Sequence, residues 1–184
     1  MVQILKKLAL ISLLVVSAGC ASYAPMQTVD RVELDRFMGD WYVISSIPTF
    51  IEKNAFNPVE NYRLQEDGSI ATTFTFNKGA LDGPVKQYHP VGFVKDTQSN
   101  ALWGMQFIWP IKADYRIVYL DSDYQNTIIG RQARDYVWVM SRNPQISKER
   151  LARYKKIVAK LGYDVSNLQQ PIHKSISKET SGEL

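Results

Sequence analysis

The stretch "FMGDWYVISSIPTF", residues Phe37 to Phe50, decides the fold. A β-strand needs only alternating apolar residues. Here Gly39 and Trp41 stand directly ahead of the apolar run, and an apolar loop follows it. A glycine and a tryptophan this close together indicate that the tryptophan has a specific partner elsewhere in the chain.

Eight short runs share a two-residue apolar period and are rich in β-branched and aromatic residues. They cover residues 41–47, 60–65, 69–77, 85–94, 101–109, 115–121, 126–132 and 136–142. Turn sequences such as "EDGS" and "DSDYQ" separate them, and such short connections favour antiparallel pairing of neighbours in chain order. Eight strands can close a small barrel, which removes the exposed sheet edges. The sequence therefore predicts an all-β fold, an eight-stranded antiparallel up-and-down β-barrel.

One segment, residues 147–162, has the period of a helix instead. Its apolar residues recur at the spacing of one helix face, and they are Leu151, Tyr154, Val158 and Leu161. Ser147 can cap the first turn, and Gly162 can end the last one. We expect one C-terminal helix that buries this stripe against the outside of the barrel.

The first residues have the pattern of an export signal. Lys6 and Lys7 precede an apolar run, residues 8–16, that is too short to span a bilayer, and the small residues "SAG" follow it. We therefore expect a lipoprotein signal peptide at 1–19, a lipidated N-terminal tether at 20–32, the barrel with its helix at 33–173, and a polar disordered tail at 174–184.

Cys20 is the only cysteine, so the chain cannot form an intramolecular disulfide. The sequence "SAGC" resembles the bacterial lipoprotein signal, in which the cysteine becomes the lipid-modified N-terminus of the mature protein. The resemblance implies a membrane anchor, and Ala21, where inner-membrane lipoproteins carry aspartate, implies the outer membrane, facing the periplasm. The alternative is an ordinary secretory signal that leaves a free thiol.

Charge and histidine content argue against two classes of function. Without residues 1–19 the chain has 20 basic and 18 acidic side chains, a formal charge of +2, which does not favour nucleic-acid binding. The basic run "KERLARYKK" is interpreted as a solvated helix face rather than a phospholipid-binding patch. His89 and His173 have no nucleophile or metal-ligand partner at a recognisable spacing, so we expect no enzyme, no metal and no cofactor. A haem ligated by His89 is a weaker alternative.

Three separated motifs and the chain end resemble those of one family. They are Gly39, Trp41 and Tyr42 in "GDWY", Asp121 and Tyr124 in "YLDSDY", Arg142 in "VMSRNPQIS", and "LGYDVSNL" after the helix. In this order they resemble a lipocalin, most closely the bacterial outer-membrane lipoprotein branch related to apolipoprotein D. The resemblance spans residues 32–172. It implies that Arg142 lies across Trp41 at the closed end of the barrel, so these residues are structural and the ligand enters at the other end.

An eight-stranded barrel encloses room for one small ligand, and inward residues alternate along each strand. The candidate cavity residues are Phe74, Phe76, Trp103, Met105, Phe107, Tyr115, Arg116 and Tyr119. Tyr115 and Arg116 are the candidates for a polar role. The alternative is that the aromatic rings only fill a core.

Two apolar loops, residues 48–56 and 108–114, should border the open end. Phe50, Ile51, Phe56 and Trp109 are candidates for a lid or a membrane contact, or they pack over the rim. Lys53 and Lys112 could meet an anionic head group.

These patterns predict a membrane-anchored binding protein of the bacterial cell envelope. Its partner would be a hydrophobic ligand, a fatty acid or a lysophospholipid, which it binds, stores or transports. Two alternatives stay open: an envelope enzyme that modifies lipids or isoprenoids, and a scaffolding lipoprotein whose barrel is filled. Dimers occur among relatives, so a homodimer is a further expectation, although no pattern here predicts an interface.

Overall fold

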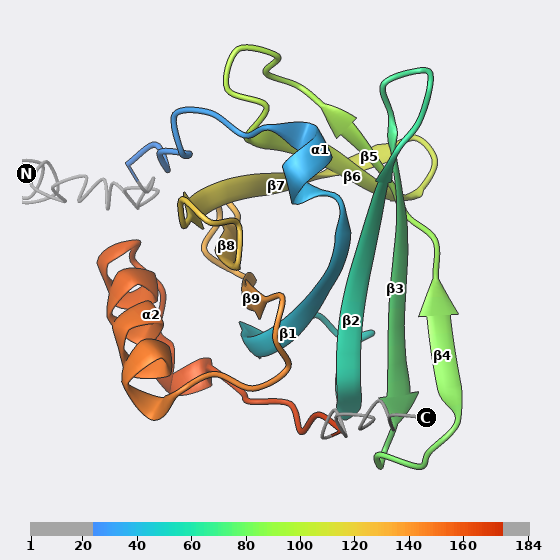
Figure 1. The fold of residues 1–184 in the computed structure, drawn as a ribbon, viewed down its shortest axis with the longest axis vertical. Coiled ribbons are helices and arrows are strands. Elements are labelled where there is room, and N and C mark those ends of the chain that lie inside the picture. The colour runs from blue at the N-terminus through green and yellow to red at the C-terminus, as the bar shows by residue number, and fades with distance from the viewer. Residues whose placement is uncertain (1–23, 175–184) are drawn as a thin grey trace, which may run out of the picture.

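A computed structural model describes residues 24–174 of the chain (Figure 1), so the expected signal peptide, Cys20 and residues 175–184 lie outside the described part. Nine antiparallel strands make up one sheet. Their bounds are β1 Gly39–Ile47, β2 Ala55–Leu64, β3 Ile70–Lys78, β4 Val85–Tyr88, β5 Val91–Val94, β6 Leu102–Ile108, β7 Ile111–Leu120, β8 Asn126–Gly130 and β9 Val137–Ser141. Because β1 pairs with both β2 and β9, and β2 also pairs with β3, eight of the strands close into a barrel. This confirms the predicted fold class.

The ninth strand arises because the run predicted at 85–94 is broken. His89 and Pro90 separate β4 from β5, and a proline has no N–H to give to a ladder. β5 pairs with the start of β3, at Ile70 and Ala71, whereas β4 pairs with its far half, from Phe74 to Asn77. On its other side β5 pairs with β6, which ends at Ile108, while in the described part of the chain β4 pairs with β3 alone. The prediction of one continuous strand here was wrong.

The sequence also underestimates β2, which begins at Ala55 rather than at residue 60. Its register with β3 shifts between Phe56 and Val59, and Asn57, which lies in this stretch, adopts a positive φ of 51°. Such a bulge interrupts the two-residue alternation on which strand prediction depends. The bulge also explains why only the second half of β2 shows the expected pattern.

Trp41 and Arg142 meet at the closed end of the barrel. Trp41 is fully buried, and the Arg142 guanidinium carbon lies 3.8 Å from the centre of its indole. Arg142 also donates hydrogen bonds to the carbonyl oxygens of Asp40 and Met38, both at 2.7 Å. Burial lowers the pKa of Arg142 to about 10, so it keeps its charge at neutral pH. One side chain therefore closes the barrel end by stacking on an aromatic ring and by binding backbone carbonyls.

Two neighbouring segments complete this end. The short helix α1, Leu34–Phe37, supplies the Phe37 carbonyl, which accepts from the indole N–H of Trp41 at 2.8 Å. Gly39 follows with a φ of +89°, in the left-handed region that favours glycine, and a Cβ there would come within 3.4 Å of Arg142. The Phe37 carbonyl and Gly39 therefore both lie where Arg142 approaches the backbone.

The turn between β7 and β8 fixes the same end from the other side. The Asp121 carboxylate accepts hydrogen bonds from the backbone N–H groups of Gln125 and Asn126. Tyr124, which has a positive φ of 56°, accepts from the Glu33 N–H through its hydroxyl at 2.9 Å. The turn thereby ties the segment before α1 to the base of the barrel.

Helix α2, Lys148–Lys160, packs on the outside of the barrel, as predicted (Figure 1). Ser147 accepts a hydrogen bond from the Arg150 N–H at 3.2 Å and so caps the first turn. Tyr154 and Val158 are buried in a cluster with residues of β8 and β9. A short 3₁₀ helix, Val165–Asn167, follows. Between residues 24 and 174 no helix is long and apolar enough to cross a membrane.

We predict that Arg142→Met lowers the free energy of unfolding by about 2 to 4 kcal/mol, because it removes the cation–π contact and leaves buried carbonyls without donors. Urea denaturation of the purified protein measures the loss. Arg153→Met, which changes an exposed arginine on α2, is the control and should stay within about 0.5 kcal/mol of the wild type. Equal stability of both variants would contradict a closing role for Arg142.

Candidate functional site

A cavity of about 290 Å³ opens at the end of the barrel opposite Trp41. The barrel wall contributes mainly apolar side chains, and the loops after β1, β6 and β8 form the mouth. The wall residues are Glu60, Tyr62, Phe74, Pro90, Met105, Ala113, Asp114, Tyr115, Ile129, Trp138 and Met140. The mouth residues are Thr49, Phe50, Ile51, Glu52, Phe107, Ile108, Arg131 and Tyr136. A concave apolar site with few polar groups is typical of small-molecule binding.

An aromatic cluster forms the floor of the cavity. The hydroxyl groups of Tyr62 and Tyr115 lie 2.7 Å apart and share a hydrogen bond. Trp103 stacks on Tyr115, with ring centres 5.3 Å apart, and meets Tyr62 edge to face. Burial raises the pKa of both tyrosines well above the usual value, so both stay neutral. The floor is therefore buried and uncharged.

Two glutamate side chains lie in this mainly apolar cavity. Glu52, at the mouth, accepts hydrogen bonds at 2.6 Å from the indole N–H of Trp138 and from the Thr49 N–H. Burial nevertheless raises the pKa of Glu52. Glu60 lies in the wall, where burial and the nearby charge of Glu52 raise its pKa well above the usual value. Both causes favour the protonated form of the Glu60 carboxyl.

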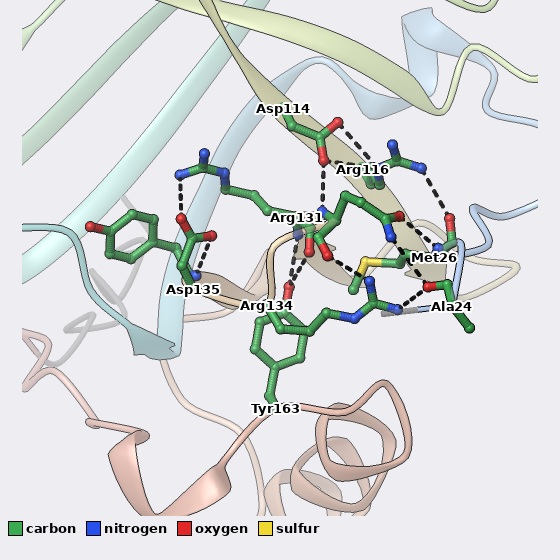
Figure 2. Close-up of polar contacts among 10 residues, drawn as sticks. Ala24, Met26, Asp114, Arg116, Arg131, Arg134, Asp135 and Tyr163 are labelled. Carbon is green, nitrogen blue, oxygen red and sulfur yellow. Dashed lines mark hydrogen bonds and ion pairs between the residues drawn. The ribbon is translucent and has the colours of Figure 1, made fainter. Parts of the chain in front are cut away.

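Arg131 is the cation at the mouth. It pairs with Asp135 at 3.2 Å and lies over the ring of Tyr136. Its Nε is buried and meets no acceptor among residues 24–174. Its backbone N–H donates to the Tyr163 hydroxyl at 2.7 Å, which ties the mouth loop to the end of α2 (Figure 2).

The segment next to Arg131 is held from both sides. The Gln132 N–H donates to Asp114 at 2.7 Å, and Asp114 forms an ion pair with Arg116 at 2.9 Å. Arg134 donates to the Leu161 carbonyl. It also donates to the Ala24 carbonyl, so the first described residue is attached to the same loop (Figure 2). This side of the mouth is therefore a fixed part of the barrel.

The candidate cavity residues divide into three groups. Phe74, Met105, Phe107 and Tyr115 line the cavity. Trp103 lies beneath it in the floor, and Phe76 is buried between Phe74 and Tyr88. Arg116 and Tyr119 lie outside the barrel, where Arg116 binds Asp114 and the Met26 carbonyl, and Tyr119 contacts Tyr154 of α2.

The position of Tyr119 has a specific cause. The register of β7 with β8 shifts between Ile117 and Tyr119, and this bulge moves Tyr119 off the face that Tyr115 and Ile117 share. Arg116 follows Tyr115 directly, so the two side chains point to opposite faces of the strand. A polar role in the cavity is therefore open to Tyr115 and not to Arg116.

The four loop residues predicted to form a lid or a membrane contact do not all lie together. Phe50 and Trp109 are 88% and 81% exposed, and the neighbours of Trp109, Ile108 and Ile111, are exposed as well. Ile51 lines the cavity. Phe56 lies elsewhere, in a groove of about 210 Å³ beside the C-terminal segment 169–172. The structure thus places Phe50 and Ile51 at the mouth, Trp109 on the exposed turn that follows the mouth residue Ile108, and Phe56 away from the mouth.

Glu52, Glu60 and Arg131 were not among the residues predicted from the sequence. A signal for Glu60 was present, because "ENYRL" alternates and puts Glu60 on the face of Tyr62. The other two lie in or beside loops, where alternation carries no information. His89 is exposed, with Nδ1 3.4 Å from the Thr73 hydroxyl, and no cluster of metal-ligating residues occurs in the described range.

Comparison with known proteins agrees with this architecture. The family model described as a lipocalin-like domain matches residues 32–173, so the chain belongs to the lipocalin family. It is 32% identical over 173 residues to temperature-induced lipocalin-1 of Arabidopsis thaliana, covering 86% of each chain. It is 27% identical to the outer membrane lipoprotein Blc of Escherichia coli, over 83% of this chain and 89% of that one. It is 28% identical to bovine apolipoprotein D, over 82% and 80% of the two chains.

Solved structures share the fold at low sequence identity. Insecticyanin from the tobacco hornworm Manduca sexta aligns with a TM-score of 0.66 and 14% identity, over 84% of this chain and 88% of that one. Lobster apocrustacyanin A1 aligns with a TM-score of 0.60 and 12% identity, over 78% and 81%. The lipocalin barrel is thus established by sequence and by structure. Lipocalins are generally binding and transport proteins.

We predict that Glu60→Gln reduces the loss of stability at high pH. A carboxyl whose pKa is raised by folding stabilises the protein below its unfolded pKa of about 4.5, and this contribution is lost as the pH rises through the folded pKa. Melting temperatures at pH 5 and pH 8 should differ less for Glu60→Gln than for the wild type. Some pH dependence should remain, because Glu52 shifts in the same direction. The exposed Glu66→Gln is the control, and an effect as large as that of Glu60→Gln would refute this account.

Proposed function

We propose that this lipocalin binds, stores or carries one small hydrophobic molecule, a fatty acid or a lysophospholipid, in the bacterial cell envelope. The apolar cavity of about 290 Å³ carries the proposal. Burial of an acyl chain in such a cavity gains about 0.8 kcal/mol per CH₂ group. The floor of Trp103, Tyr62 and Tyr115 offers nothing to a charged head group, so the chain enters first and the head group stays at the mouth.

Arg131 is the cation best placed for an anionic head group, because it lines the mouth and its buried Nε has no acceptor in the described part of the chain. Lys112 is less suitable, since its ammonium lies 3.4 Å from the ring centre of Phe93. Lys53 is exposed on the loop between β1 and β2. A carboxylate or a phosphate could therefore bind at Arg131 while the chain occupies the cavity.

The cavity also bears on the two alternative functions, a scaffolding lipoprotein and an enzyme. A scaffolding lipoprotein with a filled barrel would need no such space. An enzyme acting on lipids would need a general base that a neighbouring group orients, and Glu60 has no hydrogen-bond partner among residues 24–174. The observations favour binding.

We further propose that a lipid on Cys20 holds the protein at the outer membrane, facing the periplasm; the Escherichia coli relative is named an outer membrane lipoprotein. The Ala24 carbonyl accepts hydrogen bonds from Arg134 at 2.8 Å and from Gln132 at 3.2 Å (Figure 2). Four residues span at most about 14 Å, so the anchor would keep this side of the mouth near the bilayer. The exposed Phe50 and Trp109, together with Ile108 and Ile111, would then contact the membrane.

We predict that native mass spectrometry of the full mature chain carrying Cys20→Ser, purified without detergent, detects saturable one-to-one adducts with fatty acids and lysophospholipids. Affinity should rise with chain length, because each CH₂ buries more apolar surface. Ala113→Trp, which puts a large side chain into the cavity, should weaken binding at least tenfold. Ala152→Trp on the exposed face of α2 is the matched control. The absence of adducts from folded protein would favour the filled barrel.

Cys20→Ser should move the protein from the membrane fraction to the soluble periplasmic fraction, because the lipid chains would be its anchor. Immunoblots of separated outer membrane, inner membrane and periplasm measure the distribution. Ser17→Ala, three residues earlier, is the control and should leave the protein in the outer membrane. A membrane-bound Cys20→Ser protein would show that the anchor lies elsewhere.

A further inference from the structure

We propose that Glu60 binds an uncharged oxygen atom part-way along the ligand chain, so that the cavity selects oxygenated acyl chains, bearing a hydroxyl or keto group, over plain ones. This inference rests on the proposed function and names the chemical class of its ligand. It follows from the position of Glu60, from its lack of a partner and from the charges around it.

Glu60 lies between the floor and the mouth of the cavity. On β2, Glu60 is opposite Trp41 of β1, whereas Tyr62 is opposite Gly39, nearer the closed end. Glu60 and Tyr62 both line the cavity, and two residues along a strand span about 7 Å. A chain that reaches the floor must therefore pass Glu60.

The Glu60 carboxyl differs from the other polar groups of the cavity because it is unpartnered. Tyr62 and Tyr115 bind each other, and Glu52 accepts from Trp138 and Thr49. No backbone or side-chain group of residues 24–174 forms a hydrogen bond with the carboxyl of Glu60. Glu60 is half-buried and lines the cavity. Buried polar groups in proteins are almost always paired, so an unpaired one aimed into a binding cavity points to the ligand.

The surrounding charges decide which form of Glu60 the ligand meets. Glu52 faces it from the loop after β1, and Tyr62 and Tyr115 face it from β2 and β7. The other charged groups that line the cavity are Asp114, which pairs with Arg116, and Arg131, which pairs with Asp135 at the mouth. Neither Arg116 nor Arg131 forms an ion pair with Glu60, and burial raises the pKa of Glu60, which favours the neutral carboxylic acid with one O–H donor and one carbonyl acceptor.

A neutral acid at this depth favours one kind of ligand. At this depth the carboxylate of a ligand would meet the carboxyl of Glu60 and no cation. An acidic head group therefore binds at the mouth. A plain CH₂ chain would cover Glu60 without pairing it, which costs the desolvation of the carboxyl. A hydroxyl or keto oxygen in the chain can accept from the O–H, and a hydroxyl can also donate to the carbonyl. Sites built to pair a ligand oxygen discriminate against ligands that lack it.

The test compares stearate, 12-hydroxystearate and 12-oxostearate in competition at pH 7, read by native mass spectrometry of the full mature chain with Cys20→Ser. We expect the two oxygenated chains to bind about two- to tenfold more tightly than stearate. Moving the hydroxyl to carbon 3, toward the head group, should remove the preference. Octadecylamine tests the competing chemistry of a cationic ligand.

Two variants assign the preference to Glu60. Glu60→Gln keeps a neutral donor and acceptor and should retain the preference. Glu60→Leu should abolish it and should bind stearate at least as well as the wild type does. Glu66→Leu, on the exposed turn after β2, is the control.

Three outcomes would overturn the proposal: equal binding of all three acids, a preference that survives in Glu60→Leu, or tighter Glu60-dependent binding of octadecylamine. The first leaves the proposed function intact, because stearate still binds. Absence of binding by every chain, with circular dichroism showing folded protein, would instead overturn the proposed function and this inference with it.

Discussion

The contact between Arg142 and Trp41 is the constraint on which the rest of the structure depends. It closes one end of the barrel with a single guanidinium that stacks on the indole and binds the carbonyls of the segment entering β1. That segment must run close to Arg142, which accounts for the positive φ at Gly39. Because this end is sealed, the aromatic layer of Tyr62, Trp103 and Tyr115 can serve as a floor, and the interior has its mouth at the opposite end.

Much of this architecture could be predicted from the sequence, because apolar alternation and turn residues are local signals. The helix stripe with its Ser147 cap and the order of the signature motifs are of this kind. The errors share a cause. Pro90 splits a strand, and bulges before Val59 and Tyr119 break the alternation of inward and outward residues. The strand break and both bulges depend on how the neighbouring strand pairs. Tyr119, an inward residue by simple counting, therefore packs on α2.

The site was less predictable than the fold. Aromatic residues identified the floor and part of the wall because large apolar side chains on one strand face tend to be buried. The groups that give the cavity its chemistry are few and polar. Arg131 and Glu52 owe their positions to the loops at the mouth, and their partners Asp135 and Trp138 become evident only when those loops are folded. The alternation of β2 predicts that Glu60 points into the barrel, but its lack of a hydrogen-bond partner becomes evident only in the folded cavity.

The strand break at Pro90 gives the barrel an uneven rim. β2, β3 and β4 continue past the level at which β6 ends, so this wall is tall and the β6–β7 hairpin, which follows β5 in the sheet, is short. The short side carries Phe107, Ile108 and Trp109, all substantially exposed. Under the proposed function, a ligand would enter over this low apolar edge and against the tall wall that bears Glu60. The part of a long ligand that stays outside the cavity would then lie against exposed apolar side chains rather than in water.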